Sequence, residues 1–96
     1  MHRNQIEKIV LEGLHMANLA REDDKQLLVA PDAPLFGDGG QLDSMSLVAL
    51  IIDIEEALGE AGHNVILTAE RAMSRAQSPF RDVPSLVAYI EACLGD

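Results

Sequence analysis

Residues 44–58 carry aliphatic side chains at the spacing of one face of an α-helix, and this pattern constrains the fold more than any other in the chain. Its members are Leu47, Leu50, Ile51, Ile54 and Leu58. Full burial of each side chain contributes about 1.5–3 kcal/mol, which exceeds the differences in intrinsic helix propensity. The pattern therefore predicts an amphipathic helix from about Ser44 to Gly59 that is held in place by packing.

Two other segments show the same helical periodicity. The first runs from Asn4 to about Ala20, because Asn4 and Glu7 have the spacing of a capping box. Its apolar face comprises Ile6, Ile9, Val10, Gly13, Leu14 and Ala17. The last helix begins at Pro84 and Ser85. Its apolar stripe comprises Leu86, Ile90, Cys93 and Leu94.

A long connection separates the first two helices. It exceeds twenty residues and contains Pro31, Pro34 and several glycines. Loops of this length are uncommon inside a domain unless they are functional or anchored by their own apolar side chains. The expected anchors are Leu27, Leu28, Leu35 and Phe36. The loop is therefore predicted to be held against the core.

A short third helix is expected between the second and the last. Gly59, Gly62 and Asn64 end the second helix, and 65–67 form an extended apolar anchor. Thr68 then caps a helix from Ala69 to about Arg75. With only 3% aromatic residues and no Trp in 96 residues, the chain favours packed helices over a β-sandwich. The prediction is one all-α, four-helix domain over 1–96.

Charge and cysteine content restrict the function. Sixteen acidic against seven basic residues give a net charge of −9, which disfavours nucleic acid and anionic lipid surfaces as partners. Residues 1–60 hold most of this excess, so we expect basic partners to bind there. Cys93 is the single cysteine, and the chain has neither a membrane-spanning run nor a secretory signal. These features predict a cytoplasmic monomer with Cys93 in the core.

Other kinds of chemistry are disfavoured by spacing. His2, His15 and His63 are far apart and have no cysteine companion, so no metal site is expected. Ser44 lacks the G-x-S-x-G environment of a hydrolase nucleophile. The chain is accordingly predicted not to be an enzyme.

Ser44 stands at the predicted start of the second helix and allows two interpretations. It can cap the helix, as can Asp43, by supplying an oxygen to free N–H groups. The same helix end also stabilises an anion through its oriented N–H groups and dipole. A phosphodiester on Ser44 would lie in that field.

The segment LFGDGGQLDSMSLVALIIDIEEAL, residues 35–58, resembles the region around the cofactor serine of acyl carrier proteins. The resemblance is most specific at LDSM, and the order of helix, long loop, D-S helix, short helix and final helix extends it over the chain. It implies a four-helix carrier bundle with 4'-phosphopantetheine on Ser44 and Asp43 as the flanking acid. A phosphopantetheinyl transferase would transfer the arm from coenzyme A in the presence of Mg²⁺. The cargo would then be carried as a thioester at the end of the arm.

The second helix has a further apolar stripe that its core face does not absorb, formed by Met45, Val48 and Ile52. Val48 could equally belong to a helix buried on more than one side. In the resembled family this surface meets the enzymes that load and unload the cargo. Charged residues available to such basic partners are Asp43, Asp53, Glu55 and Glu56.

Two departures from the fatty-acid synthase carriers leave the cargo open. Ser46 and Ala49 occupy positions that are often acidic in those carriers, which weakens the case for docking to generic fatty-acid enzymes. The segment 69–90 is more basic and longer around the third helix than in those carriers, so a specialised carrier of lipid or secondary-metabolite biosynthesis is expected. D-alanyl and other aminoacyl carriers share the LDSM pattern and remain an alternative. A second alternative is a cofactor-free helical adaptor that binds a partner helix in a groove, with Ser44 only as a cap.

Overall fold

The computed structural model describes residues 2–37, 39–65, 67 and 80–94. Within these residues the chain forms the α-helices α1 (Arg3–Asn18), α2 (Ser44–Glu60) and α4 (Val83–Cys93), and the short 3₁₀ helix η1 (Asp23–Lys25). β-type pairing in the described part is limited to isolated bridges. The all-helical prediction is thus confirmed for the described residues, whereas the expected third helix at 69–75 lies outside them.

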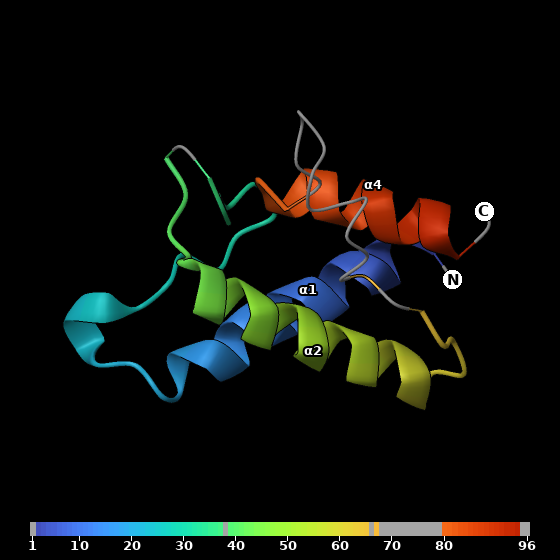
Figure 1. Cartoon of the computed structure of the whole chain (residues 1–96), viewed down its shortest axis with the longest axis horizontal. Coiled ribbons are helices and arrows are strands. Elements are labelled where there is room, and N and C mark those ends of the chain that lie inside the picture. Colours follow the sequence, from blue (N-terminus) through green and yellow to red (C-terminus); the bar gives the residue numbers. More distant parts are fainter. Residues whose placement is uncertain (1, 38, 66, 68–79, 95–96) are drawn as a thin grey trace.

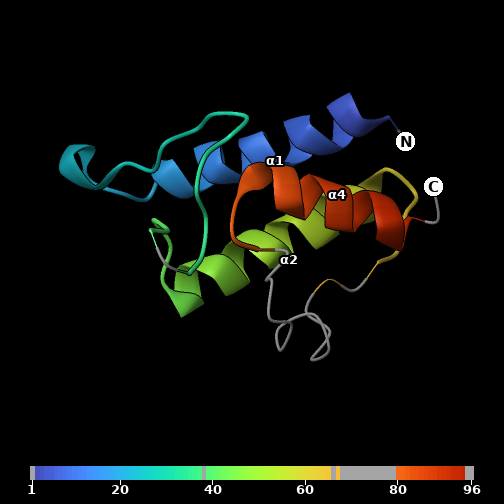
Figure 2. The same ribbon diagram turned by 90° about the horizontal axis from the view of Figure 1, so that it is seen from above.

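Helix α1 packs against both α2 and α4. Figures 1 and 2 show α1 running in the opposite direction to the other two helices, which run roughly the same way as each other. The long loop and η1 therefore connect the end of α1 to the start of α2 at one end of the bundle. No helix among the described residues combines the length and hydropathy needed to cross a bilayer.

The core is aliphatic apart from the buried Phe80, and it matches the predicted faces of α1 and α2. Ile6, Val10 and Leu14 of α1 are completely buried. The five predicted α2 residues Leu47, Leu50, Ile51, Ile54 and Leu58 are exposed by at most 2%. The two helices approach closely at Gly13, where an added Cβ would lie 2.7 Å from Leu50 Cδ1.

The start of α1 differs from the prediction, whereas the end of α2 agrees with it. Helix α1 begins at Arg3 with His2 as N-cap, and the His2 N–H donates to Gln5 Oε1 at 2.9 Å. The predicted Asn4 cap is therefore wrong, because the chain already becomes helical one residue earlier. At the end of α2 the prediction holds, since Gly62 takes φ +91° and the His63 N–H donates to the Leu58 carbonyl at 2.8 Å. That is the Schellman arrangement, which favours glycine at this position.

The loop is held against the chain just before α4 by backbone hydrogen bonds. The Leu35 N–H donates to the Arg81 carbonyl at 2.8 Å, and the Phe36 N–H donates to the Phe80 carbonyl at 2.9 Å. In return the Val83 N–H donates to the Ala33 carbonyl at 3.0 Å. Two segments far apart in sequence are thereby joined next to the core.

Two side-chain amides hold the loop where it leaves α1. The side chain of Asn18 accepts from the Leu27 N–H at 2.6 Å and donates to the Leu27 carbonyl at 3.0 Å. Gln41 binds both backbone groups of Leu28 in the same way, at 2.8 and 3.1 Å. Of the predicted anchors, Leu27 and Leu35 are buried and Phe36 packs on the core. Leu28 is 54% exposed, so this anchor is wrong; its backbone is held instead.

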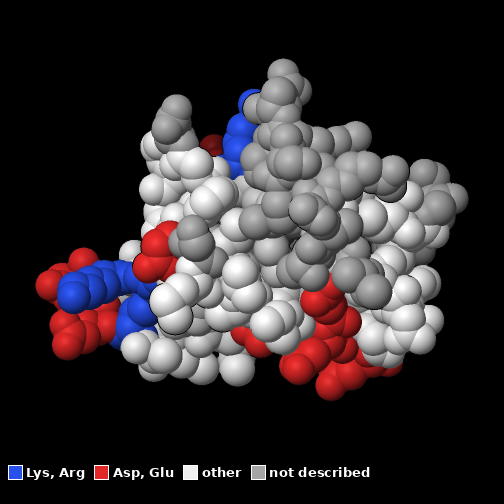
Figure 3. Space-filling view, in the orientation of Figure 1, with Lys and Arg blue, Asp and Glu red and all other residues white. Residues whose placement is uncertain are grey.

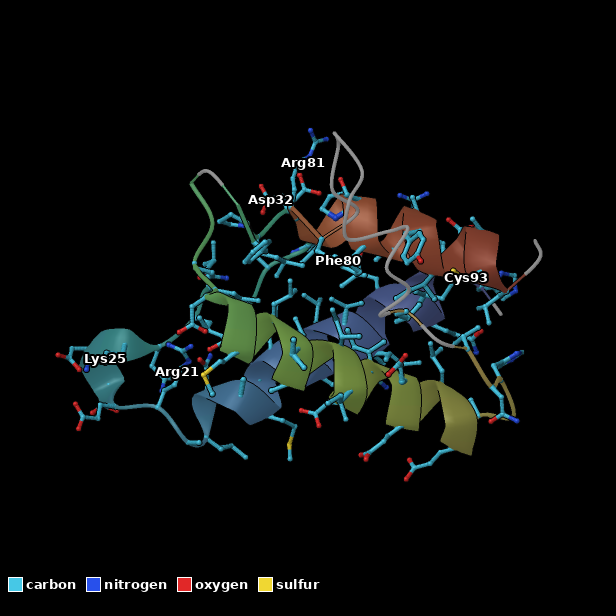
Figure 4. All side chains as sticks on the ribbon, viewed as in Figure 1. Arg21, Lys25, Asp32, Phe80, Arg81 and Cys93 are labelled. Carbon is cyan, nitrogen blue, oxygen red and sulfur yellow. The ribbon has the colours of Figure 1, made fainter. Side chains whose placement is uncertain are left out.

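Cys93 is also placed differently from the prediction, because it is exposed. The buried residues of α4 are Val83, Leu86, Val87 and Ile90. Arg3, the first residue of α1, pairs with Glu91 at 3.1 Å. Figure 4 shows Cys93 at the C-terminal end of α4, where it lies beside Leu94, which packs on the core.

Replacing Asn18 by Ala tests whether its side-chain amide clamps the loop at Leu27. The change leaves the part-buried backbone groups of Leu27 without their partner, so the free energy of unfolding should fall by about 1–3 kcal/mol. Urea denaturation followed by circular dichroism measures it. Asn64→Ala, at an exposed asparagine after α2, is the control and should change stability by less than about 0.5 kcal/mol. Equal effects of the two substitutions would contradict the clamp.

Candidate functional site

Just before α2, the end of the loop pairs with an earlier part of the same loop. The Leu42 N–H donates to the Leu35 carbonyl at 2.8 Å, and Phe36 and Leu42 form a parallel bridge. At Gly40 an added Cβ would lie 2.6 Å from the Leu35 carbonyl oxygen, so only glycine fits there. The position of Asp43 and Ser44 is therefore set by the loop that precedes them.

Asp43 is the N-cap of α2. Its Oδ1 accepts from the Ser46 N–H at 2.7 Å, and its own carbonyl accepts from the Leu47 N–H at 2.9 Å. Hydrogen bonds from the amide and hydroxyl of Ser46 lower the pKa of Asp43, and the charge of Arg21 lowers it further. Asp43 is thus a carboxylate at neutral pH, and the capping role that its sequence position predicts is confirmed.

Ser44 is the first residue of α2. Its backbone lies at the positive end of a helix of 17 residues, where oriented N–H groups and the helix dipole favour a negative charge. Its side chain is outside the part of the chain that the structure describes. The predicted attachment residue therefore has the backbone position expected of it.

Arg21 lies at the beginning of the loop, and its side chain contacts the same end of α2. Its Nη2 donates to Ser46 Oγ at 3.1 Å, and its Nη1 donates to the Lys25 carbonyl at 3.2 Å. Figure 4 shows Arg21 between η1 and the beginning of α2. Sequence reasoning missed this residue, because nothing local to Arg21 indicates a contact with Ser46 across the long loop.

The predicted partner-binding stripe is exposed on α2. Met45 is 83% exposed, Val48 is 42% exposed and Ile52 is 46% exposed. This placement decides the interpretation of Val48, which is a surface residue and does not belong to a second buried face. Exposed large aliphatic side chains grouped on one helix are typical of interaction surfaces.

The predicted acids of α2 fall into two groups. Asp53 and Glu56 are exposed, and Figure 3 shows acidic side chains gathered over the C-terminal half of α2. Glu55 is half-buried, and its Oε2 accepts from the Leu67 N–H at 2.6 Å. Its carboxylate therefore serves the connection after α2, while Asp53 and Glu56 present their charges to solvent.

Comparison of the chain with family models, with curated proteins and with solved structures finds no significant match.

The cap at Asp43 predicts a pH dependence that Asp43→Asn should reveal. An asparagine still accepts the Ser46 hydrogen bond but carries no charge. Because folding lowers the pKa of Asp43, its carboxylate stabilises the fold above the unfolded value of about 3.9, and this contribution is lost as the pH falls through the folded pKa. The wild type should therefore exceed the variant in stability at pH 6, and the difference should disappear towards pH 2.

Urea unfolding at a series of pH values measures this difference. Asp53→Asn, which removes a charge from the exposed middle of the same helix, is the matched control for net charge. A stability difference between wild type and Asp43→Asn that is the same at pH 6 and pH 2 would rule out the charged cap.

Proposed function

We propose that this chain is an acyl carrier protein that holds its cargo as a thioester on a 4'-phosphopantetheine arm attached to Ser44. The observation that carries the proposal is the position of Ser44, which directly follows the capping residue Asp43 and opens α2. The antiparallel packing of α1 against α2 and α4 supports the finer assignment to a four-helix carrier bundle. The protein itself would be non-catalytic and cytoplasmic.

Electrostatics at this helix end suit a phosphodiester. The N-terminal dipole contributes about 0.3–1 kcal/mol to an exposed anion, and Arg21 adds a positive charge next to Ser46. Asp43 carries the opposing negative charge, yet it is tied to the Ser46 N–H as the cap. In a chain of net charge −9, this helix end thus combines two features that favour an added phosphate.

The exposed stripe of Met45, Val48 and Ile52 supports a role in partner binding. It lies on the helix that Ser44 opens, so an enzyme that handles the arm would meet it. Asp53 and Glu56 can steer a basic partner towards the stripe, because complementary charge raises association rates. The expected partners are a phosphopantetheinyl transferase and the enzymes that load and unload an acyl or aminoacyl cargo.

The same exposed stripe also favours a second candidate, a cofactor-free adaptor that binds an amphipathic partner helix through α2. In that case Ser44 would carry no group. Covalent modification of Ser44 separates the two candidates, because the adaptor requires none.

Incubating the full chain with coenzyme A, Mg²⁺ and a broad-specificity phosphopantetheinyl transferase should add one arm, read as a single increase in intact mass. Ser44→Ala should remain unmodified. Ser46→Ala is the matched control, since Ser46 is a second serine in the same helical turn, and it should be modified to the same extent as the wild type. An unmodified wild type, or modification of Ser44→Ala, would refute the carrier assignment.

The stripe is tested by Ile52→Gln. Truncating a residue near the centre of an interface can cost more than about 1 kcal/mol, so for a stripe centred on Val48 and Ile52 kcat/KM of the transferase for the apo-protein should fall by roughly fivefold or more. Because Ile52 is exposed, the thermal midpoint should stay close to that of the wild type. Ala88→Gln, at an exposed position on α4, is the control. Equal kcat/KM for all three chains would exclude Ile52 from the interface.

A further inference from the structure

A partly open pocket of about 320 Å³ lies between the C-terminal half of α1, the start of the loop and the first turns of α2. Its walls are predominantly aliphatic, with Leu14 and Ala17 from α1, Leu27 and Leu42 from the loop, and Ala49 and Leu50 from α2. The four leucines are buried core residues, so packing keeps the walls in place. The pocket is therefore a concave apolar site supported by the core.

Among the described residues of the lining, the polar side chains lie next to each other. Arg21 and Ser46 line the pocket, and the Arg21 guanidinium donates to Ser46 Oγ at 3.1 Å. Its other hydrogen bond goes to the Lys25 carbonyl. Both acceptors are neutral, and none of the ion pairs between described residues includes Arg21. A guanidinium with donors to spare thus lies at the edge of an apolar pocket.

Size and lining indicate the chemical class of the ligand. An apolar cavity of roughly 150 Å³ takes up benzene, and ligand sites begin at roughly 300 Å³, so this pocket accommodates a flexible chain of moderate length. Aliphatic walls suit an alkyl chain. The planar donor fork of arginine suits a carboxylate, which it binds through two parallel hydrogen bonds.

The acidic character of the chain does not oppose such a ligand at short range. Charges farther than about 8 Å are screened at physiological ionic strength. Asp43 is one acid in the field of Arg21, but its carboxylate is bound to the Ser46 N–H at 2.7 Å. The acidic residues 22–24, which follow Arg21 in the chain, are exposed to solvent. The local contact with Arg21 therefore decides the preference for the head group.

We propose that this pocket is a reversible binding site for a medium-chain aliphatic carboxylate. The alkyl chain lies between the leucines of α1, the loop and α2, and the carboxylate binds Arg21. This site goes beyond the proposed carrier function and binds its ligand in the absence of a phosphopantetheine arm.

Isothermal titration calorimetry of the full, unmodified chain with sodium octanoate tests the site. Binding should be saturable with one ligand per chain. Octan-1-ol has the same chain length without the charge, so it should bind roughly tenfold more weakly, the ratio expected for loss of one charge-assisted hydrogen bond. Ser44→Ala should bind octanoate as the wild type does, whichever way the arm-attachment experiment comes out.

Two pairs of matched variants locate the ligand. Ala49→Leu fills the pocket and should weaken binding at least tenfold, whereas Ala88→Leu makes the same change at an exposed position of α4 and should leave it unchanged. Arg21→Gln should weaken octanoate binding roughly tenfold and leave octan-1-ol binding unaltered. Arg3→Gln removes a charge at the far end of α1 and should have no effect. Circular dichroism verifies that each variant is folded.

Several results would overturn the proposal. These are the absence of saturable octanoate binding to the wild type, equal affinity of folded Ala49→Leu and wild type, and loss of binding in Ser44→Ala. Equal octanoate affinities of Arg21→Gln and wild type would likewise reject the carboxylate contact. Because Ser44→Ala is included, failure of the pocket and failure of the carrier assignment give different results.

Discussion

Burial of α1 against α2 and α4 is the constraint on which the described structure depends. Its stripe of Ile6, Val10 and Leu14 is completely buried, and α1 contacts each of the other two helices. Gly13 lets α2 approach closely enough for Leu50 to fill the contact. Because α2 and α4 both run antiparallel to α1, the end of α1 and the start of α2 meet at one end of the bundle.

The loop between these helix ends shows where prediction from sequence succeeds and where it fails. Leu27, Leu35 and Phe36 are recognisable as anchors because isolated aliphatic or aromatic residues in a polar loop gain free energy by burial. Leu28 has the same character but its side chain is exposed, while Gln41 binds its backbone. Such hydrogen bonds join residues far apart in the sequence and leave no periodic pattern to detect.

The same distinction applies to the candidate site. The capping role of Asp43 is local, three residues from the Ser46 N–H that it accepts, and is predictable from helix chemistry alone. Arg21 arrives across the loop, so its contact depends on the tertiary fold. The prediction for Cys93 fails for a related reason: periodicity gives the direction of a side chain, but not whether a neighbouring element covers it.

Helix α2 presents three different surfaces, and this division links the fold to the proposed functions. One face supplies the core, a second carries the exposed stripe of Met45, Val48 and Ile52, and between them Ala49 and Leu50 line the pocket with Arg21. An exposed aliphatic stripe promotes association, whereas a net charge of −9 makes like copies repel one another. That repulsion falls away with a basic or neutral partner. The acidic composition thus opposes self-association through the stripe, and under the proposed function this leaves the stripe available to a different protein without any change in the packing that holds α2.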